Sequence, residues 1–266
     1  MTVPEQRTTP AGDVDYEATG VGYAGRRRPD PRIAALVHAA LGDARTVVNV
    51  GAGAGSYEPA DRDVVAVEPS AQMRAQRPHG SAPVVDATAE NLPFPDGAFE
   101  AAMATVTIHQ WRDPAAGLRE LRRVSSGPVV VLTFDPAAVP EWWLDEYVPE
   151  LFAAEAARYP TIDAVCTALG GVTSVARVLI PLDCTDGFTE AFYGRPEAFL
   201  DPAVRAAQSA WNFADPPTIA AGLDRLAADL ASGAWDARHG HLRSQPWFHG
   251  AVRLVVAVPD PPSGHG

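Results

Sequence analysis

Three glycines and one acid offer the clearest chemistry in the sequence. Gly51, Gly53 and Gly55 alternate in the stretch VVNVGAGAGSYEP, directly after an apolar run. A glycine has no Cβ, so its backbone can press closely against a ligand. Glu68 ends the next apolar run, and its carboxylate could accept both hydroxyls of a ribose. Together these residues predict a site for a ligand that carries a ribose.

The glycine loop lacks two features that a dinucleotide-binding site requires. The fingerprint G-x-G-x-x-G requires a third glycine where this chain has Ser56. It also requires the N-terminus of a helix beside the pyrophosphate, and Pro59 truncates any such helix. We therefore expect a ligand without a diphosphate.

His109 is the candidate for proton transfer. It follows an apolar run in the stretch TIHQW, and histidine is the commonest general base of enzymes. Two interpretations are open: a base for a protonated nucleophile, or a packed histidine that orients its loop. Cys166 and Cys184 have no metal-ligand or disulfide spacing, and we expect no metal.

A sheet must position these residues. Uniformly apolar runs cover 46–50, 63–69, 82–87, 99–105 and 127–134, with a sixth at 172–180 and a seventh at 251–259. Apolar residues at every position, rather than at alternate ones, indicate a parallel sheet with helices on both faces. Ligands of such sheets bind at the carboxyl ends of the strands, which is where the glycines, Glu68 and His109 fall.

The helices of this pattern have recognisable starts. Asp30 and Pro31 open one helix, which Gly42 ends, and Asp113 is the natural N-cap of a helix over 113–124. A further helix is predicted over 161–170. The segment 183–249 is mostly helical in pattern and rich in proline and aromatic residues, so we expect it to form a cap over the sheet.

Composition excludes several classes of function. The formal net charge of −12 disfavours nucleic acid as a partner. All 21 basic residues are arginine, which excludes a Schiff-base or P-loop lysine. The polar start and the lack of an apolar stretch of 18 residues predict a cytoplasmic protein with no membrane contact, as a monomer or homodimer.

Three motifs resemble those of the class I S-adenosylmethionine-dependent methyltransferases, of the small-molecule, type 11 kind. They are VNVGAGAG, VVAVEPS and ATAENLPFPDGAFEAAMA, of which AENLPFPDGAF is the most specific. The resemblance covers roughly residues 14–135. It implies an α/β fold with a doubly wound, seven-stranded, mostly parallel Rossmann-like sheet and a helical cap inserted between the last two strands.

The resemblance assigns residues to S-adenosylmethionine. They are Tyr16, Tyr23, Arg28, Asn49, Gly51, Ala52, Gly53, Gly55, Glu68, Pro69, Ser70, Thr88, Ala89, Glu90, Ala104 and Thr105. Two of them depart from the family pattern, because position 49 is usually acidic and position 88 is often aspartate. We therefore expect Asn49 and Thr88 to weaken cofactor binding.

The patterns along the chain, with the lid that the resemblance implies, predict a domain organisation. Disordered tails are expected at 1–13 and 260–266, with an N-terminal lid and first helix at 14–45. The cofactor-binding core would span 46–182, the substrate cap 183–249 and the last core strand 250–259.

The implied reaction is methyl transfer to a small organic molecule of specialised metabolism, by in-line displacement, with S-adenosylhomocysteine as product. His109 would act as base or orient the site. Two alternatives stay open: bound cofactor used in a cyclisation or rearrangement, and a non-catalytic cofactor-binding protein.

Overall fold

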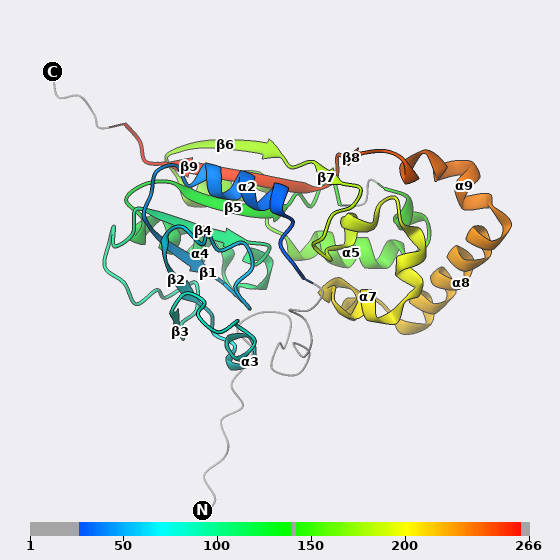
Figure 1. Ribbon diagram of the computed structural model, residues 1–266, viewed down its shortest axis with the longest axis horizontal. Helices are drawn as coiled ribbons and strands as arrows, with labels where there is room; N and C mark the ends of the chain where they lie inside the picture. Colours follow the sequence, from blue (N-terminus) through cyan, green and yellow to red (C-terminus); the bar gives the residue numbers. More distant parts are fainter. Residues whose placement is uncertain (1–26, 140–141, 262–266) are drawn as a thin grey trace, which may run out of the picture.

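A seven-stranded sheet forms the centre of the computed structural model, which describes residues 27–139 and 142–261 (Figure 1). Its strand order is β3-β2-β1-β4-β5-β9-β6. The strands are β1 (Thr46–Val50), β2 (Asp63–Val67), β3 (Val84–Val85), β4 (Ala101–Thr105), β5 (Val129–Phe134), β6 (Val172–Arg177) and β9 (Val252–Val258). β1 to β5 pair in parallel, and β9 lies antiparallel between β5 and β6. The predicted mostly parallel sheet is confirmed.

Helices cover both faces of this sheet. On one face, Val47 and Met103 pack in the same core as α2 (Pro31–Ala40). On the other, Val48 and Ala102 pack with α4 (Pro114–Val124) and α6 (Ile162–Leu169). Successive strand residues point to opposite faces, so a strand between two helical layers must be apolar throughout. This explains the unbroken apolar runs of the sequence.

The predicted helix starts are confirmed at Asp30 and Asp113. The Asp30 carboxylate accepts a hydrogen bond from the backbone N–H of Arg32, and Asp113 accepts one from the N–H of Ala116. Each acid thereby satisfies one of the N–H groups that the first helical turn leaves without a partner.

Most strands end within two residues of the predicted bounds, but two are shorter by three residues or more. The run at 82–87 forms only β3, because Pro83 has no N–H to donate and the Asp86 side chain turns to Arg74. The run at 172–180 ends at Arg177, and Ile180–Pro181 forms a separate strand, β7, which pairs with β8 (Trp247–Phe248). The chain leaves the main sheet there and enters the cap.

The inserted cap between β6 and β9 is helical, as predicted. It contains α7 (Pro202–Ala206), α8 (Pro216–Ser232) and α9 (Ala234–His239), with 3₁₀ helices η4 (Thr189–Phe192), η5 (Pro196–Leu200), η6 (Ser209–Phe213) and η7 (Gly240–Arg243). Figure 1 shows α5 (Pro149–Arg158) grouped with α7, α8 and α9 beyond one end of the sheet. Residues between β5 and α6 therefore also contribute to this layer.

Buried aromatic side chains hold the cap together. Trp143 begins η3 (Trp143–Glu146) and Trp142 precedes it. Both rings lie among Phe152, Phe199 and Trp235. The rings of Trp143 and Trp235 meet edge to face, with centroids 5.2 Å apart. These residues share one core with α2, which fixes the cap against the sheet. Among the described helices, none is both long and apolar enough to cross a membrane.

Candidate functional site

The strand order reverses between β1 and β4, and the loops that follow these two strands meet there. β2 and β3 lie to one side of β1, whereas β5 lies beyond β4. A Cβ built on Gly51 would lie 2.1 Å from the Oγ1 of Thr107, so the two loops are in direct contact. Open α/β sheets bind their ligands at such a reversal, outside the carboxyl ends of the strands.

The glycine loop takes a conformation that favours glycine. Gly51, Gly53 and Gly55 have φ angles of 69°, 52° and 97°, which side chains with a Cβ rarely adopt. Residues 51–60 form turns and no helix joins β1 to β2, as the sequence predicted. A pyrophosphate would find no helix N-terminus in this loop.

Glu68 is bonded to the glycine loop. Its Oε2 accepts a hydrogen bond of 2.8 Å from the backbone N–H of Gly53, and its Oε1 accepts one of 2.9 Å from Ser70. Burial raises the pKa of this carboxyl, and the two backbone hydrogen bonds oppose the rise. Each oxygen keeps a further lone pair, so the carboxylate can still receive a pair of hydroxyls.

Asn49 lies fully buried beneath the loop, beside an ion pair that sequence reasoning missed. Its Nδ2 donates a hydrogen bond of 3.1 Å to Glu58, whose carboxylate also receives Arg77 at 2.8 Å. The Oδ1 of Asn49 is buried without a hydrogen-bond partner among the described residues. This acceptor at the base of the loop fits a ligand that brings an N–H donor, such as an amino acid ammonium group.

The remaining predicted cofactor residues fall into three groups. Tyr16 and Tyr23 lie outside the described residues, and Arg28 is exposed. Ala52, Pro69, Ser70 and Thr105 flank the strand ends beside the glycine loop. Thr88, Ala89 and Glu90 follow β3, and the Glu90 carboxylate accepts a hydrogen bond from the N–H of Asp113. Ala104 packs in the core with α4, so its methyl group points away from the α2 face.

A pocket of about 360 Å³, counting its solvent-open part, adjoins the ends of β4 and β5. Its walls come from the sheet, from α5 and from the cap. The lining residues are Arg27, Val106, His109, Phe134, Glu155, Tyr159, Phe188, Thr189, Gln208, Ser209 and Ala210. The pocket therefore combines flat aromatic surface with several polar groups.

His109 is a buried member of this pocket. Its ring lies against Tyr159 with centroids 4.4 Å apart, and its Nε2 is 2.7 Å from the Nε2 of Gln110. Burial, together with the positive charges of Arg158 and Arg27, lowers the pKa of His109 well below its usual value. The imidazole is therefore neutral at physiological pH.

Val106 holds a strained backbone at the pocket wall. Its φ of 52° is rare for a β-branched residue, and its N–H donates a hydrogen bond of 2.7 Å to the carbonyl of Leu132. Strain of this kind costs about 1–3 kcal/mol and persists where the surrounding structure enforces it. The strained residue directly follows β4, where the chain begins to line the pocket.

Glu155 and Gln208 are pocket residues that the sequence analysis did not select. Glu155 follows Leu151 by four residues and Phe152 by three in α5, so it lies on the buried face of that helix. An acid on an otherwise apolar helix face is a signal that the sequence does contain. Gln208 lies in an irregular stretch of the cap, where no periodicity marks it.

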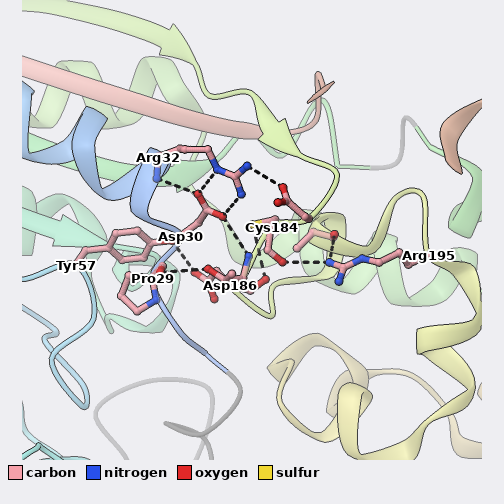
Figure 2. A network of polar contacts seen from close by, with 10 residues as sticks. Pro29, Asp30, Arg32, Tyr57, Cys184, Asp186 and Arg195 are labelled. Atoms are coloured by element: carbon pink, nitrogen blue, oxygen red, sulfur yellow. Dashed lines mark hydrogen bonds and ion pairs between the residues drawn. The ribbon is translucent and has the colours of Figure 1, made fainter. Parts of the chain in front are cut away.

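A polar network joins the glycine loop, the start of α2 and the start of the cap (Figure 2). Asp186 accepts hydrogen bonds of 2.7 Å from the hydroxyl of Tyr57 and from the Nε of Arg27. Asp30 accepts from Arg32 and from the N–H of Thr185. Residues from three distant parts of the chain are thus held together beside the site.

Two comparisons with known proteins extend these observations. Residues 48–130 match the family model described as a methyltransferase domain. The structure is similar to that of a putative methyltransferase from an antibiotic biosynthesis pathway of Anabaena variabilis. That similarity has a TM-score of 0.81 and 30% sequence identity, and it covers 87% of this chain and 98% of the other.

A curated relative supports the same assignment over a shorter length. The chain is 31% identical over 123 residues to the demethylmenaquinone methyltransferase of Corynebacterium kroppenstedtii. The match covers 44% of this chain, and it spans about half, 49%, of the relative's length. The fold, the site and these similarities show that the chain belongs to the class I S-adenosylmethionine-dependent methyltransferase family, and that S-adenosylmethionine is its cofactor.

Proposed function

We propose that this protein transfers a methyl group from S-adenosylmethionine to a small organic molecule by in-line displacement. The observation that carries this proposal is the pocket at the ends of β4 and β5, next to the loop reversal. Its mixture of aromatic and polar walls suits a small organic ligand. A polypeptide or a nucleic acid would need a longer groove.

The cofactor residues of the proposal follow from the strand ends. The backbone of Gly51, Gly53 and Gly55 would receive the methionine and ribose portions, and Glu68 would accept the ribose hydroxyls. The buried Oδ1 of Asn49 would accept from the amino group. Pro69, Ser70, Thr88, Ala89 and Glu90 would surround the adenine, and Ala52, Ala104 and Thr105 would lie beside the methionine end. When bound, S-adenosylmethionine supplies an electrophilic methyl group.

The chain's own part in such a reaction is orientation, since displacement needs the nucleophile and the methyl carbon aligned at close range. We assign His109 to this role rather than to that of a base. A base is most effective when its pKa lies near the working pH, and burial moves the pKa of His109 far below it. Its contacts with Tyr159 and Gln110 instead hold the loop after β4 in place.

The names of the relatives favour a small acceptor. One relative is described as part of an antibiotic biosynthesis pathway, and the other is named for a quinone substrate. The net charge of −12 also disfavours a nucleic acid. We therefore place the reaction in specialised metabolism.

Two measurements test the proposal. Titration with S-adenosylmethionine and with S-adenosylhomocysteine should give saturable binding, and absence of binding to both would refute the function. Incubation with methyl-labelled S-adenosylmethionine and separated cell fractions should place the label in the low-mass fraction. Label in protein or nucleic acid instead would contradict a small acceptor.

A matched pair of variants tests the ribose assignment. Glu68→Ala should weaken S-adenosylhomocysteine binding by about 1–3 kcal/mol, because a charged hydrogen-bonding partner is lost. Glu100→Ala is the control, since Glu100 is exposed and precedes β4, at the opposite end of that strand. Equal affinities in the two variants would argue against Glu68.

A further inference from the structure

Gln208 offers a buried hydrogen-bond donor to the pocket. The side chain is 3% exposed, and its Oε1 accepts a hydrogen bond of 2.9 Å from the indole N–H of Trp211. An indole N–H can only donate, so this contact fixes which end of the amide is oxygen. The Nε2 is buried and has no hydrogen-bond partner among the described residues. A pocket ligand with an acceptor oxygen would satisfy it.

Glu155 offers a carboxylate to the same pocket. It is half-buried in α5, and in the described part of the chain its oxygens make no hydrogen bond or ion pair. Burial raises its pKa to about 7, against the lowering effect of Arg158 and Arg27. An open carboxylate of this kind can accept a hydrogen bond from a ligand.

The groups that face Glu155 decide which kind of donor suits it. Arg27 lies on the segment before α2 and bonds to Asp186, and Arg158 donates to the Oγ of Ser209. His109 is kept neutral by its burial, and Glu190 of η4 is engaged by the N–H of Ala251. The positive charges of Arg27 and Arg158 already lie near this carboxylate, so it does not require a cationic donor. A hydroxyl carries no charge and can donate to the carboxylate.

The apolar walls decide the shape of the ligand. The rings of Phe134 and Tyr159 are 5.4 Å apart between centroids, and those of Phe134 and Phe188 are 5.7 Å apart. All three rings line the pocket, so the apolar part of a ligand there would meet aromatic side chains.

We infer that the pocket selects a flat, aromatic methyl acceptor that carries a hydroxyl and a carbonyl. Glu155 receives the hydroxyl, and the Nε2 of Gln208 donates to the carbonyl oxygen. The inference rests on the proposed function, because it treats this pocket as the place of the acceptor. It adds two specificity-determining residues and a chemical class of substrate.

Three small probes test the two contacts separately. 4-Hydroxyacetophenone carries both groups, 4-methoxyacetophenone lacks the donor, and 4-ethylphenol lacks the carbonyl. Their affinities are measured by calorimetry in the presence of S-adenosylhomocysteine. The wild-type protein should bind the first probe about tenfold more tightly than either of the others, the usual effect of one hydrogen bond to a buried group.

The variants should separate these preferences. Glu155→Leu should bind 4-hydroxyacetophenone and 4-methoxyacetophenone equally, yet still bind 4-hydroxyacetophenone more tightly than 4-ethylphenol. Gln208→Leu should bind 4-hydroxyacetophenone and 4-ethylphenol equally, yet still bind 4-hydroxyacetophenone more tightly than 4-methoxyacetophenone. Glu190→Gln is the matched control and should keep both preferences, because its remaining oxygen still accepts from Ala251. Equal binding of all three probes by the wild-type protein, no saturable binding, or unchanged preferences in the two leucine variants would each overturn the inference.

Binding of S-adenosylhomocysteine alone is measured on the same proteins. It should be unchanged in the Glu155 and Gln208 variants, which shows that they fold. If the wild-type protein fails to bind it, the proposed function fails, whatever the probes show. If it binds and the probe pattern is absent, only the assignment of the pocket fails.

Discussion

The hydroxyl of Tyr57 donates a hydrogen bond of 2.7 Å to the Oδ2 of Asp186, and the two residues are 129 positions apart. Tyr57 is 3% exposed and Asp186 2%, so the contact is shielded from water. Tyr57 ends the glycine loop with a φ of 63°, and Asp186 lies among the first residues of the cap. One carboxylate thus fixes both the cofactor loop and the cap that covers the pocket.

Tyr57→Phe should lower the free energy of unfolding by about 1.5–3 kcal/mol, because the buried Asp186 carboxylate keeps Arg27 but loses the hydroxyl donor of Tyr57. The affinity for S-adenosylhomocysteine should also fall, since the loop loses its anchor. Urea unfolding and calorimetric titration measure the two effects.

Tyr147→Phe is the control for this prediction. Tyr147 also donates a 2.7 Å hydrogen bond to an aspartate, Asp229, but that side chain is 31% exposed and also binds Arg238. The Tyr147 hydroxyl also accepts from Arg238, but Asp229 and Arg238 stay paired with each other and are both partly exposed. Water can therefore replace the lost hydroxyl, and the cost should stay below about 1 kcal/mol. Equal losses in the two variants would show that the Tyr57 contact has no special role.

The lowered pKa of the Asp30 carboxyl predicts that the protein loses stability in acid. Burial alone would raise the pKa of this carboxyl, but hydrogen bonds from Arg32 and Thr185 outweigh it and lower the pKa from 3.8 to about 2. A carboxyl with a lowered folded-state pKa contributes stability above its unfolded-state pKa. That contribution is lost as the pH falls from about 4 through about 2.

Asp30→Asn tests this, because asparagine can still cap α2 while it carries no charge. The wild-type protein should be more stable than the variant by about 1–2 kcal/mol near neutral pH, and the difference should shrink as the pH falls through this range. Urea unfolding across pH measures the difference. A gap that does not change with pH would contradict the role of the ionised carboxylate.

Local patterns in the sequence predict most of the sheet and its helices. The unbroken apolar strands, the N-caps Asp30 and Asp113, and the glycine loop each depend on residues that are neighbours in the chain. The boundaries are less accurate where tertiary pairing decides them, as at β3, which has a partner on one side only.

Local sequence patterns predict only part of the site. Glu68 ends its strand beside the glycine loop, so its place follows from the strand order. Tyr57, Asp186 and Gln208 meet their partners through the packing of the cap, which no local pattern specifies. Glu155 is intermediate, since the helix period places it on a buried face but does not identify what that face covers.

Gly51→Ala should destabilise the protein through two separate effects. A residue with a Cβ is strained at a φ of 69°, and its Cβ would collide with Thr107. The strain alone costs about 1 kcal/mol, and the collision adds to it by pushing the loop after β4 away. Both the free energy of unfolding and cofactor affinity should fall.

Gly42→Ala isolates the first effect. Gly42 has a similar φ of 60°, but nothing lies within 4 Å of a Cβ built on it. This variant should lose only the strain energy, about 1 kcal/mol, and should bind S-adenosylhomocysteine normally. If Gly42→Ala were as damaging as Gly51→Ala, the contact between the two loops would be irrelevant.

Glu155 should also make stability depend on pH, with the opposite sign to Asp30. Its folded-state pKa is raised from 4.5 to about 7, so the folded protein holds this proton more tightly than the unfolded chain. Its effect on stability therefore becomes unfavourable as the pH rises from about 4.5 through about 7. Glu155→Gln should be more stable than the wild-type protein by about 1–3 kcal/mol above that range, and nearly equal below it.

The same ionisation should control the choice of ligand. A hydrogen bond from a hydroxyl to an ionised carboxylate is about twice as strong as one between neutral groups. The preference for 4-hydroxyacetophenone over 4-methoxyacetophenone should therefore increase as the pH rises through about 7, the pKa to which burial raises Glu155. Glu155→Gln should show a preference that does not change over this range. Glu190 also titrates near this range, because burial and the nearby Glu155 raise its pKa to about 8. Glu190→Gln removes that second titration and should retain the increase, because Glu155 is unchanged and Glu190 bonds to Ala251 and not to the ligand. An unchanged slope in Glu155→Gln would mean that another group titrates in the pocket.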